Sequence, residues 1–256
     1  MIHHWNELTS PELGALAVDK AVAVLVLGAI EQHGPHLPLA TDLIIGEGLL
    51  QAALEKLAPE YPVLVMSPLA IGASEEHNHF AGTLSLAPDQ AAAMIVSVGE
   101  CIHRSGIKRL VLVNSHGGNH AVMNMAALEL RRRLGMLVVK ASYLRFDPPA
   151  GVLDAEELRL GLHGGRSETA MMLQLRPELV DMDRAADFQS SAAEQTLLGP
   201  EGQASWAWLA EDLNPAGVAG RADLATAEQG RQLLDHYSAI LAEVLSQAAA
   251  FDTGSF

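Results

Sequence analysis

Short, largely apolar runs that alternate with longer amphipathic stretches are the feature that most limits the folds open to this chain. The runs are Ala21–Gly28, Val63–Ser67, Arg109–Asn114 and Met136–Ser142. They are rich in β-branched residues and lack regular polar alternation, which is typical of strands covered on both faces. We therefore expect the centre of the fold to be a mainly parallel sheet.

The stretches between these runs have the spacing of helices. Asp42–Leu57, Asp89–Ser105 and His120–Leu134 place apolar residues at intervals of three and four, and Gly106 and Gly135 stand where C-terminal caps are expected. Strand, helix and strand in repeated succession form right-handed βαβ units. The predicted fold class is α/β, a three-layer α/β/α sandwich around a mainly parallel sheet.

The second half of the chain has a weaker pattern. Arg145–Leu153 and Phe188–Asn214 are predicted as long loops, with a short helix from about Ser167 to Leu175 between them. Ala222–Ala250 is predicted to be one long final helix. No linker, repeat or charge block divides the sequence, so we expect a single domain over residues 1–256.

Charge and cysteine content exclude several classes of protein. Sixteen Lys and Arg against thirty-one Asp and Glu give a formal net charge of −15, which disfavours nucleic acids and anionic membranes as partners. No apolar run approaches the roughly 18 residues of a membrane span, and no secretory signal is visible. We expect a cytoplasmic protein that binds a small-molecule substrate. Cys101 is the single cysteine and is predicted to be a small buried apolar group.

Polar clusters follow the predicted strands. Glu31–His36 comes after the first strand, Ser74–His79 after the second and Asn114–Asn119 after the third, while His163–Thr169 lies beyond the fourth. Most of the histidines lie in or beside these clusters. Because ligands of open parallel sheets bind beyond the carboxyl ends of the strands, the four clusters are expected to meet in one cleft.

The side chains in these clusters suit a metal centre. Glu31 and His33 leave the first strand together, His116 ends the third, and Asp42 opens a helix. A carboxylate at a helix N-terminus is favoured by the dipole and can offer a second oxygen, as a metal-bridging group must. Imidazoles mixed with carboxylates suit Zn²⁺, Mn²⁺ or Fe²⁺ better than Ca²⁺ or Mg²⁺.

Each residue also has a purely structural interpretation. Asp42 alone could be an ordinary helix N-cap, and His36 or His79 alone could be a loop histidine. Glu75 and Glu76 are adjacent, so at most one of them is expected to face the cleft. The recurrence of such residues at one edge of one sheet favours the functional interpretation.

Taken together, these motifs resemble those of the creatininase (creatinine amidohydrolase) family. Glu31–His36, with Asp42 eleven residues after Glu31, is similar to the family's metal motif. The segments similar to the family's FPGTxSL, NGHGGN and HxGxxET motifs are Phe80–Leu86 (with Ala81 at the usual proline), Asn114–Asn119 and His163–Thr169. The motifs stand in family order, and the last seventy residues match less.

The resemblance implies a site with two divalent metal ions per chain, with zinc preferred and manganese or iron as alternatives. Glu31 and His116 would bind one ion, His33 the other, and Asp42 would bridge both. His163 would be the catalytic acid/base for the departing nitrogen. The resemblance also implies the creatininase-type sandwich and assembly as a homo-hexamer.

Two departures from the family pattern bear on the site. Creatininase has a glutamate two residues after the counterpart of His116, where this chain has Gly118. Glu168 is expected to fill this place and so to be both a metal ligand and essential for catalysis; the alternative is that it only stabilises a helix N-terminus. The second departure is the absence of tryptophan from 143–146 and 159–162, which match stretches that surround the substrate in creatininase.

The predicted function is a dinuclear metal-dependent amidohydrolase. It would use metal-activated water to cleave a C–N bond, other than a peptide bond, in a small cyclic amide or formamide. A peptide- or ring-trimming hydrolase of the same family is one alternative. A non-catalytic metal-binding assembly subunit is another, against which the intact His163 and Glu168 argue. No G-x-S-x-G motif supports a serine hydrolase.

Overall fold

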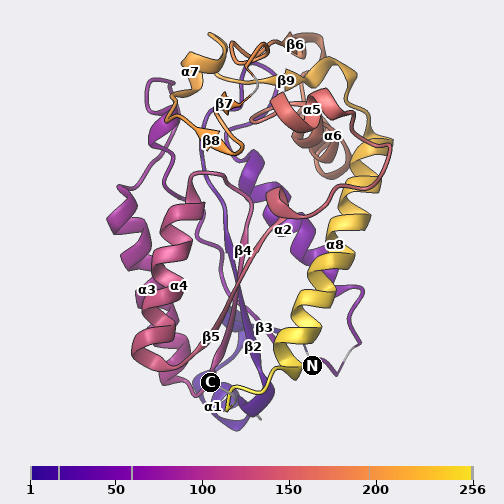
Figure 1. Cartoon of the computed structure of the whole chain (residues 1–256). Coiled ribbons are helices and arrows are strands. Elements are labelled where there is room, and N and C mark those ends of the chain that lie inside the picture. Colours follow the sequence, from indigo (N-terminus) through magenta and orange to yellow (C-terminus); the bar gives the residue numbers. More distant parts are fainter. Residues whose placement is uncertain (1, 17, 59, 196, 255–256) are drawn as a thin grey trace.

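A five-stranded parallel sheet forms the centre of the protein (Figure 1). The computed structural model describes residues 2–16, 18–58, 60–195 and 197–254. In spatial order the strands are β1 (Ile2–His4), β3 (Val63–Val65), β2 (Val22–Leu27), β4 (Arg109–Asn114) and β5 (Leu137–Ser142). All four predicted strands are confirmed. The edge strand β1 was not predicted, because three residues are too few to show a period.

Two helical layers cover the sheet, so the predicted three-layer α/β sandwich is confirmed. Helices α3 (Pro88–Arg104) and α4 (Asn119–Leu134) cover one face, and α2 (Thr41–Leu54) and α8 (Ala227–Ala250) cover the other (Figure 1). Successive residues of a strand point to opposite faces, and both faces of β2 are therefore apolar. Its odd-numbered residues join the core beneath α3 and α4, and its even-numbered residues join the core beneath α2 and α8.

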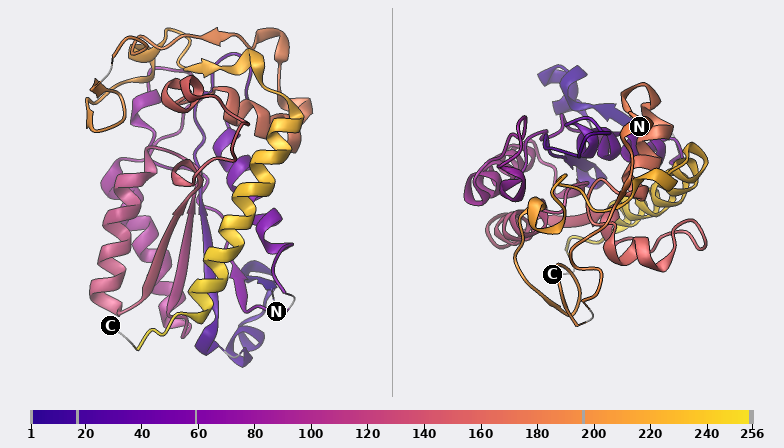
Figure 2. Two further views of the ribbon diagram at one scale, coloured as in Figure 1. Left: turned by 45° about the vertical axis from the view of Figure 1, so that its right-hand side comes forward. Right: turned by 90° about the horizontal axis from the view of Figure 1, so that it is seen from above.

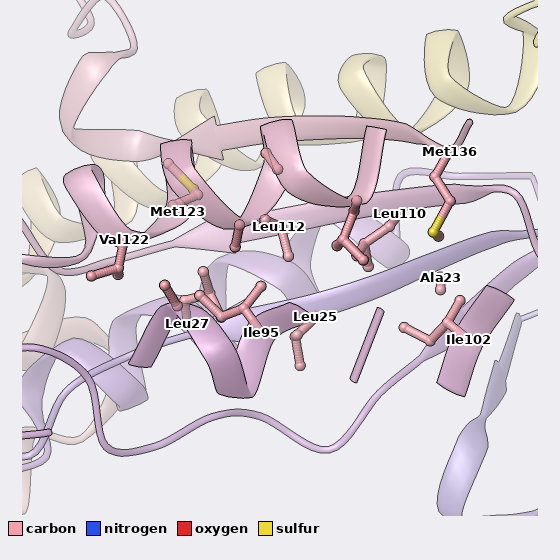
Figure 3. Packing of buried hydrophobic residues seen from close by; sticks show 14 of the residues in the cluster. Ala23, Leu25, Leu27, Ile95, Ile102, Leu110, Leu112, Val122, Met123 and Met136 are labelled. Atoms are coloured by element: carbon pink, nitrogen blue, oxygen red, sulfur yellow. The ribbon is translucent and has the colours of Figure 1, made fainter. Parts of the chain in front are cut away.

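The packing beneath α3 and α4 shows what fixes this layer (Figure 3). Leu25 and Leu112 of the sheet lie in one cluster with Ile95 of α3 and Val122 of α4, and none of these side chains is more than 2% exposed. Burying a leucine or isoleucine of this kind contributes roughly 1.5–3 kcal/mol. The apolar spacing of the two helices is thus matched by the apolar face of the sheet.

The last helix begins later than the sequence suggested. The predicted span Ala222–Ala250 divides into a 3-10 turn, η7 (Ala222–Leu224), and helix α8, which starts at Ala227. The boundary is set by Thr226, whose side chain accepts a hydrogen bond from the Gln229 backbone in a reciprocal capping box. At 24 residues α8 is long, yet no helix among the described residues is long and apolar enough to cross a membrane.

A cap made from the second half of the chain lies over the carboxyl ends of the strands, opposite the end where both termini lie (Figures 1 and 2). The predicted helix is confirmed as α6 (Arg166–Leu175), and 146–153 is a loop as predicted, but Phe188–Asn214, also predicted as a loop, contains regular structure. The cap holds α5 (Ala155–Leu160), α7 (Ala210–Leu213) and two pairs of short strands, β6 (Asp187–Phe188) with β9 (Gly220–Arg221) and β7 (Leu198–Gly199) with β8 (Ala204–Ser205). Elements of two to six residues carry no period that a sequence can reveal.

Short elements complete the described chain. Near the N-terminus α1 (Ser10–Ala15) begins at Thr9, which forms a capping box with Glu12. The remaining 3-10 turns are η1 (Trp5–Glu7), η2 (Val18–Lys20), η3 (Glu75–His77), η4 (Tyr143–Arg145), η5 (Pro177–Leu179) and η6 (Met182–Arg184).

The prediction for Cys101 was wrong. The thiol is exposed on α3 rather than buried. The residues of α3 that face the core include Ile95, Gly99 and Ile102, and Cys101 lies on the helix surface away from them. A cysteine has no amphipathic signature of its own, so only the phase of the helix decides its exposure.

Candidate metal centre

Five side chains from separate elements meet beyond the carboxyl ends of β2 and β4. Glu31 and His33 lie on the loop after β2, Asp42 in the first turn of α2, His116 after β4, and Glu168 in the first turn of α6. Their exposed fractions lie between 0% and 8%, so the structure brings together and buries all five residues that the sequence singled out as metal ligands.

One group consists of Glu31, Asp42 and His116. The His116 Nδ1 atom lies 3.2 Å from both Glu31 Oε1 and Asp42 Oδ2. The other ring nitrogen, Nε2, donates a hydrogen bond to the Ala73 carbonyl oxygen at 2.9 Å. This bond orients the ring so that Nδ1 faces the two carboxylates, and a backbone carbonyl commonly orients a metal-binding histidine in this way.

A second group consists of His33, Asp42 and Glu168. His33 Nδ1 donates to the Glu31 carbonyl oxygen at 3.1 Å, and its Nε2 lies 3.3 Å from Asp42 Oδ1 and 3.8 Å from Glu168 Oε2. In each group the candidate ligand atoms lie within 4.8 Å of one another. The two groups share Asp42, whose Oδ1 faces His33 and whose Oδ2 faces His116.

Several buried atoms in these groups have no hydrogen-bond partner among the described residues. They are both carboxylate oxygens of Glu31, Nε2 of His33 and Oδ2 of Asp42. Leaving a buried polar group unsatisfied costs about 1–3 kcal/mol, and more for a charged group. Cations bound in the two groups would satisfy these atoms, and the mixture of imidazole and carboxylate suits zinc, manganese or iron.

The electrostatics of the metal-free centre also indicate a place for positive charge. Burial disfavours the charged form of His33, but the carboxylates of Asp42 and Glu168 outweigh it and raise the pKa of His33 to about 9. The pKa of buried His116 is likewise held well above its ordinary value by Glu31 and Asp42. Burial raises the pKa of Glu168 to about 7. The carboxylates thus favour positive charge at the place where a divalent cation would bind.

His163 lies against this centre with a different protonation. Its ring packs on those of His33 and His77, each at a centroid distance of 4.2 Å. Nε2 donates to the Gln32 carbonyl oxygen at 2.7 Å, and Nδ1 lies 3.6 Å from Glu31 Oε1. Burial and the two neighbouring imidazoles hold the pKa of His163 well below its ordinary value. His163 is therefore a neutral imidazole whose Nδ1 can accept a proton or, together with Glu31 and His33, a metal ion.

Of the adjacent residues Glu75 and Glu76, only Glu76 faces the centre, as expected. Glu75 is exposed, whereas Glu76 Oε1 lies 3.6 Å from His116 Nε2. Glu76 also lies beside Gly118, because a Cβ atom added to that glycine would be 2.7 Å from Glu76 Oε1. The same Cβ would lie 2.5 Å from His116 Nε2 and would overlap severely with the Ala73 carbonyl oxygen. The backbone at position 118, where creatininase has a glutamate, is thus too tightly packed in this chain to hold a side chain.

The sequence reasoning missed His77 and Tyr143. His77 Nε2 lies 3.3 Å from Glu31 Oε1, and its Nδ1 accepts a hydrogen bond from Gln32 Nε2 at 2.9 Å. The Tyr143 hydroxyl donates to Glu168 Oε1 at 3.3 Å. The available signal for His77 was its place in the polar cluster after the second strand. Tyr143 lies in the stretch 143–146, which matches a substrate-surrounding stretch of creatininase, but nothing in the sequence indicated its contact with Glu168.

Two histidines from the polar clusters lie outside the centre, as their structural interpretation predicted. His36 is buried, and its Nε2 hydrogen-bonds to the Thr169 hydroxyl of α6 at 3.0 Å. His79 is exposed and pairs with Glu211. Neither contacts the five candidate ligands.

Buried Glu157 of α5 ties together the backbone segments that carry His163 and Glu168. Its Oε1 accepts from the Arg166 amide at 2.7 Å, at the start of α6, and its Oε2 accepts from the Arg221 amide of β9 at 2.8 Å. The residue before β9, Ala219, donates its amide to the His163 carbonyl oxygen at 2.8 Å. The Glu157 carboxylate therefore holds the start of α6 and strand β9 in place beside the centre.

Comparison with known proteins agrees with this geometry. The profile of the creatininase family, described as creatinine amidohydrolase, matches residues 6–245. A mycofactocin precursor peptide peptidase from Mycobacterium tuberculosis is 32% identical over 237 residues, which cover 89% of this chain and 86% of that protein. A creatinine amidohydrolase from Pseudomonas putida is 34% identical over 205 residues, covering 71% and 75% of the two chains.

Solved creatininase structures share the fold and contain metals. The structure described as manganese creatininase has a TM-score of 0.78 and 27% identity, with 95% of this chain and 97% of that chain covered. A zinc–zinc form of a creatininase mutant has a TM-score of 0.75 and 29% identity, again over 95% and 97% of the two chains.

Proposed function

The chain belongs to the creatininase family of C–N bond hydrolases, and from that premise we propose that it is a dinuclear metal-dependent amidohydrolase acting on a small cyclic amide or formamide. The observation that carries this proposal is the pair of ligand groups joined at Asp42, with buried atoms that have no hydrogen-bond partner among the described residues. A single carboxylate that offers one oxygen to each group is what a site for two neighbouring ions requires.

In the proposed site, Glu31, Asp42 and His116 hold one ion, and His33, Asp42 and Glu168 hold the other. Zinc is our first choice, with manganese or iron as alternatives, because imidazole and carboxylate ligands suit all three. Such ions, when bound, supply a hydroxide nucleophile at neutral pH and polarise a carbonyl oxygen. Tyr143 and the Gly164 amide orient Glu168 through hydrogen bonds of 3.3 Å and 2.7 Å to its two oxygens.

His163 performs the proton transfer in this proposal. The Gln32 carbonyl keeps the ring proton on Nε2, so Nδ1 is free to take the proton released when water adds to the substrate carbonyl. His163 then gives this proton to the departing nitrogen as the C–N bond breaks, and the products are a carboxylic acid and an amine. General acid–base catalysis of this kind contributes about 10²–10⁴-fold.

A peptide-trimming hydrolase is the second candidate. The mycobacterial precursor peptide peptidase, which matches most of this chain at 32% identity, favours it. A non-catalytic metal-binding assembly subunit is the third, and the positioned, neutral His163 argues against it. We also propose a homo-hexamer, on the family resemblance alone; light scattering that reports a monomer at micromolar concentration would contradict it.

Elemental analysis combined with a substrate screen tests the proposal. Protein reconstituted with Zn²⁺ or Mn²⁺ should hold close to two ions per chain and hydrolyse at least one member of a panel of cyclic amides, formamides and short peptides. Asp42→Asn should lose the most metal, because Asp42 faces both groups. A wild-type protein that binds no divalent ion after reconstitution would refute the dinuclear site. Two bound ions without hydrolysis of any compound would favour the non-catalytic assembly subunit.

A further inference from the structure

A cavity of about 330 Å³ adjoins Glu168 on the cap side of the candidate metal centre. Its walls come from η4, α5, α6, α8 and the segments on either side of α5, and they include Leu144, Phe146, Leu158 and Leu162. Glu168 lines the same cavity, so the space leads directly to one of the proposed metal ligands. Pockets for small ligands occupy roughly 300–1,000 Å³, which places this one among the smallest and admits only a compact group.

Apolar and aromatic residues make up most of the lining, and polar groups contribute the rest of its surface. The thirteen described residues that line the cavity include no lysine, arginine or histidine, whereas they include Glu157 and Glu168. A phosphate or carboxylate on the ligand would find no cationic side chain in these walls, so its loss of hydration would go uncompensated there. The cavity therefore selects against anionic substituents.

Two large apolar side chains stand exposed at this cavity. Leu144 is 42% exposed and Leu158 is 52% exposed, although both could be shielded by an apolar ligand between them. Exposed apolar residues grouped around a concave site mark a surface that a ligand covers. Both stretches that lack tryptophan, 143–146 and 159–162, also contribute to these walls, and Gly161 adds no side chain to the space.

We propose that this cavity binds an uncharged apolar substituent of the substrate, either aromatic or branched aliphatic, attached beside the C–N bond that is cut. The substrate class is then a hydrophobic amide rather than a phosphorylated or carboxylated one. This inference rests on the proposed amide hydrolysis and narrows its substrate.

A substituent series measures the preference. N-methylformamide, N-isobutylformamide and N-benzylformamide are compared with N-(carboxymethyl)formamide on the zinc-loaded and manganese-loaded protein, with matching acyl-substituted amides as a second set. In at least one set kcat/KM should rise about fourfold for each methylene that the substituent buries. The value for the carboxylate-bearing compound should fall back to that of the methyl compound or below. Equal kcat/KM values across both sets, or a preference for the anionic compound, would overturn the inference.

Matched variants tie the preference to the cavity. Leu144→Trp fills the space from a partly exposed position, so the ratio of kcat/KM for benzyl to methyl substrate should fall about tenfold. Leu128→Trp is the control, because Leu128 is 68% exposed on α4, in the layer covering the opposite face of the sheet. The control should keep the wild-type ratio, and both variants should keep the wild-type metal content. A Leu144→Trp ratio equal to that of the control would remove the cavity from substrate selection.

A binding measurement separates failure of this inference from failure of the proposed function. Benzyl alcohol has no bond for this centre to cut, and saturation-transfer NMR detects its contact with the metal-loaded protein. Transfer should be present in the wild type and in Leu128→Trp and should be strongly reduced in Leu144→Trp. Binding with this pattern but no hydrolysis of any amide would count against the proposed function alone, whereas hydrolysis with no such binding would refute the cavity's role.

Discussion

An alanine at position 118 should disturb the metal centre, whereas an alanine at position 117 should not. Gly118 has φ −60° and ψ −23°, which any residue can adopt, so the obstacle is space and not conformation. Its added Cβ would overlap the Ala73 carbonyl oxygen and lie 2.5 Å from His116 Nε2. A Cβ at Gly117 would meet nothing within 4 Å. Gly117 and Gly118 thus form a matched pair, in which only position 118 lacks room for a side chain.

The expected size of the effect follows from what must move. Overpacking a buried site costs about 1–3 kcal/mol, with backbone rather than a flexible side chain as the closest neighbour here. For a domain of this size that corresponds to a fall in Tm of roughly 2–12 °C. The overlap also displaces the Ala73 carbonyl that orients His116, and loss of such a supporting contact typically weakens metal binding about 10–100-fold.

Thermal unfolding of the metal-free proteins and competition with a chelator for Zn²⁺ measure the two effects. Gly117→Ala should stay within roughly 0.5 kcal/mol of the wild type, as exposed substitutions usually do. Gly118→Glu, which places the family's glutamate at this position, should be at least as damaging as Gly118→Ala and should not strengthen metal binding. If Gly118→Ala matched Gly117→Ala in both measurements, the close approach of Ala73 and His116 would not be what excludes a side chain.

Three further predictions concern the centre and its supports. Glu168→Gln should leave the protein folded with one of its two ions and almost no activity, whereas His163→Ala should keep both ions and lose turnover; metal loss from His163→Ala would make it a ligand instead. Glu157→Gln should lower the free energy of unfolding by about 1.5–3 kcal/mol in denaturant titrations, because an amide cannot accept from both backbone N–H groups; an unchanged value would contradict the anchoring role. Burial lowers the pKa of His36 from 6.5 to about 4, so the unfolded chain binds a proton that the folded one refuses, and stability should fall as the pH drops from 6.5 toward 4. His36→Gln should lose less stability over that interval in pH-dependent unfolding, and an equal loss would mean that other groups cause it.

The parts of the fold that repeat could be predicted from the sequence. Strands β2 and β4 are buried on both faces, so β2 and the interior of β4 (110–113) are uniformly apolar. Helices α2, α3 and α4 show the apolar spacing of covered helices. The cap could not be predicted in this way, because its elements are short and its conformation depends on tertiary hydrogen bonds such as those of Glu157. The exposure of Cys101 depends on which face of α3 is turned toward the core, and a single cysteine does not indicate that face.

For the candidate centre, the residue types were predictable and their supports were not. Glu31, His33, Asp42 and His116 stand at strand ends or a helix start, where topology alone makes them converge. The contribution of Glu168 to the same cluster depends on how the cap folds back over the sheet, and Tyr143 reaches it from the end of β5. The tight backbone at Gly118 is visible only when the Ala73 loop is in place.

The two histidines proposed as ligands indicate why the centre is built from loops that follow strands. Each ring donates one N–H to a backbone carbonyl, His33 to Glu31 and His116 to Ala73, and thereby presents its other nitrogen to Asp42. Those carbonyls belong to segments leaving the sheet, whose positions the buried strands fix. The backbone carbonyls thus fix which nitrogen of each imidazole faces Asp42. The Gln32 carbonyl orients His163 in the same way, by accepting the hydrogen bond from Nε2. Because the pKa of His163 is held low, its Nδ1 carries no proton and can accept one. Hydrogen bonds from imidazoles to backbone carbonyls therefore support both the proposed metal binding and the proposed proton transfer.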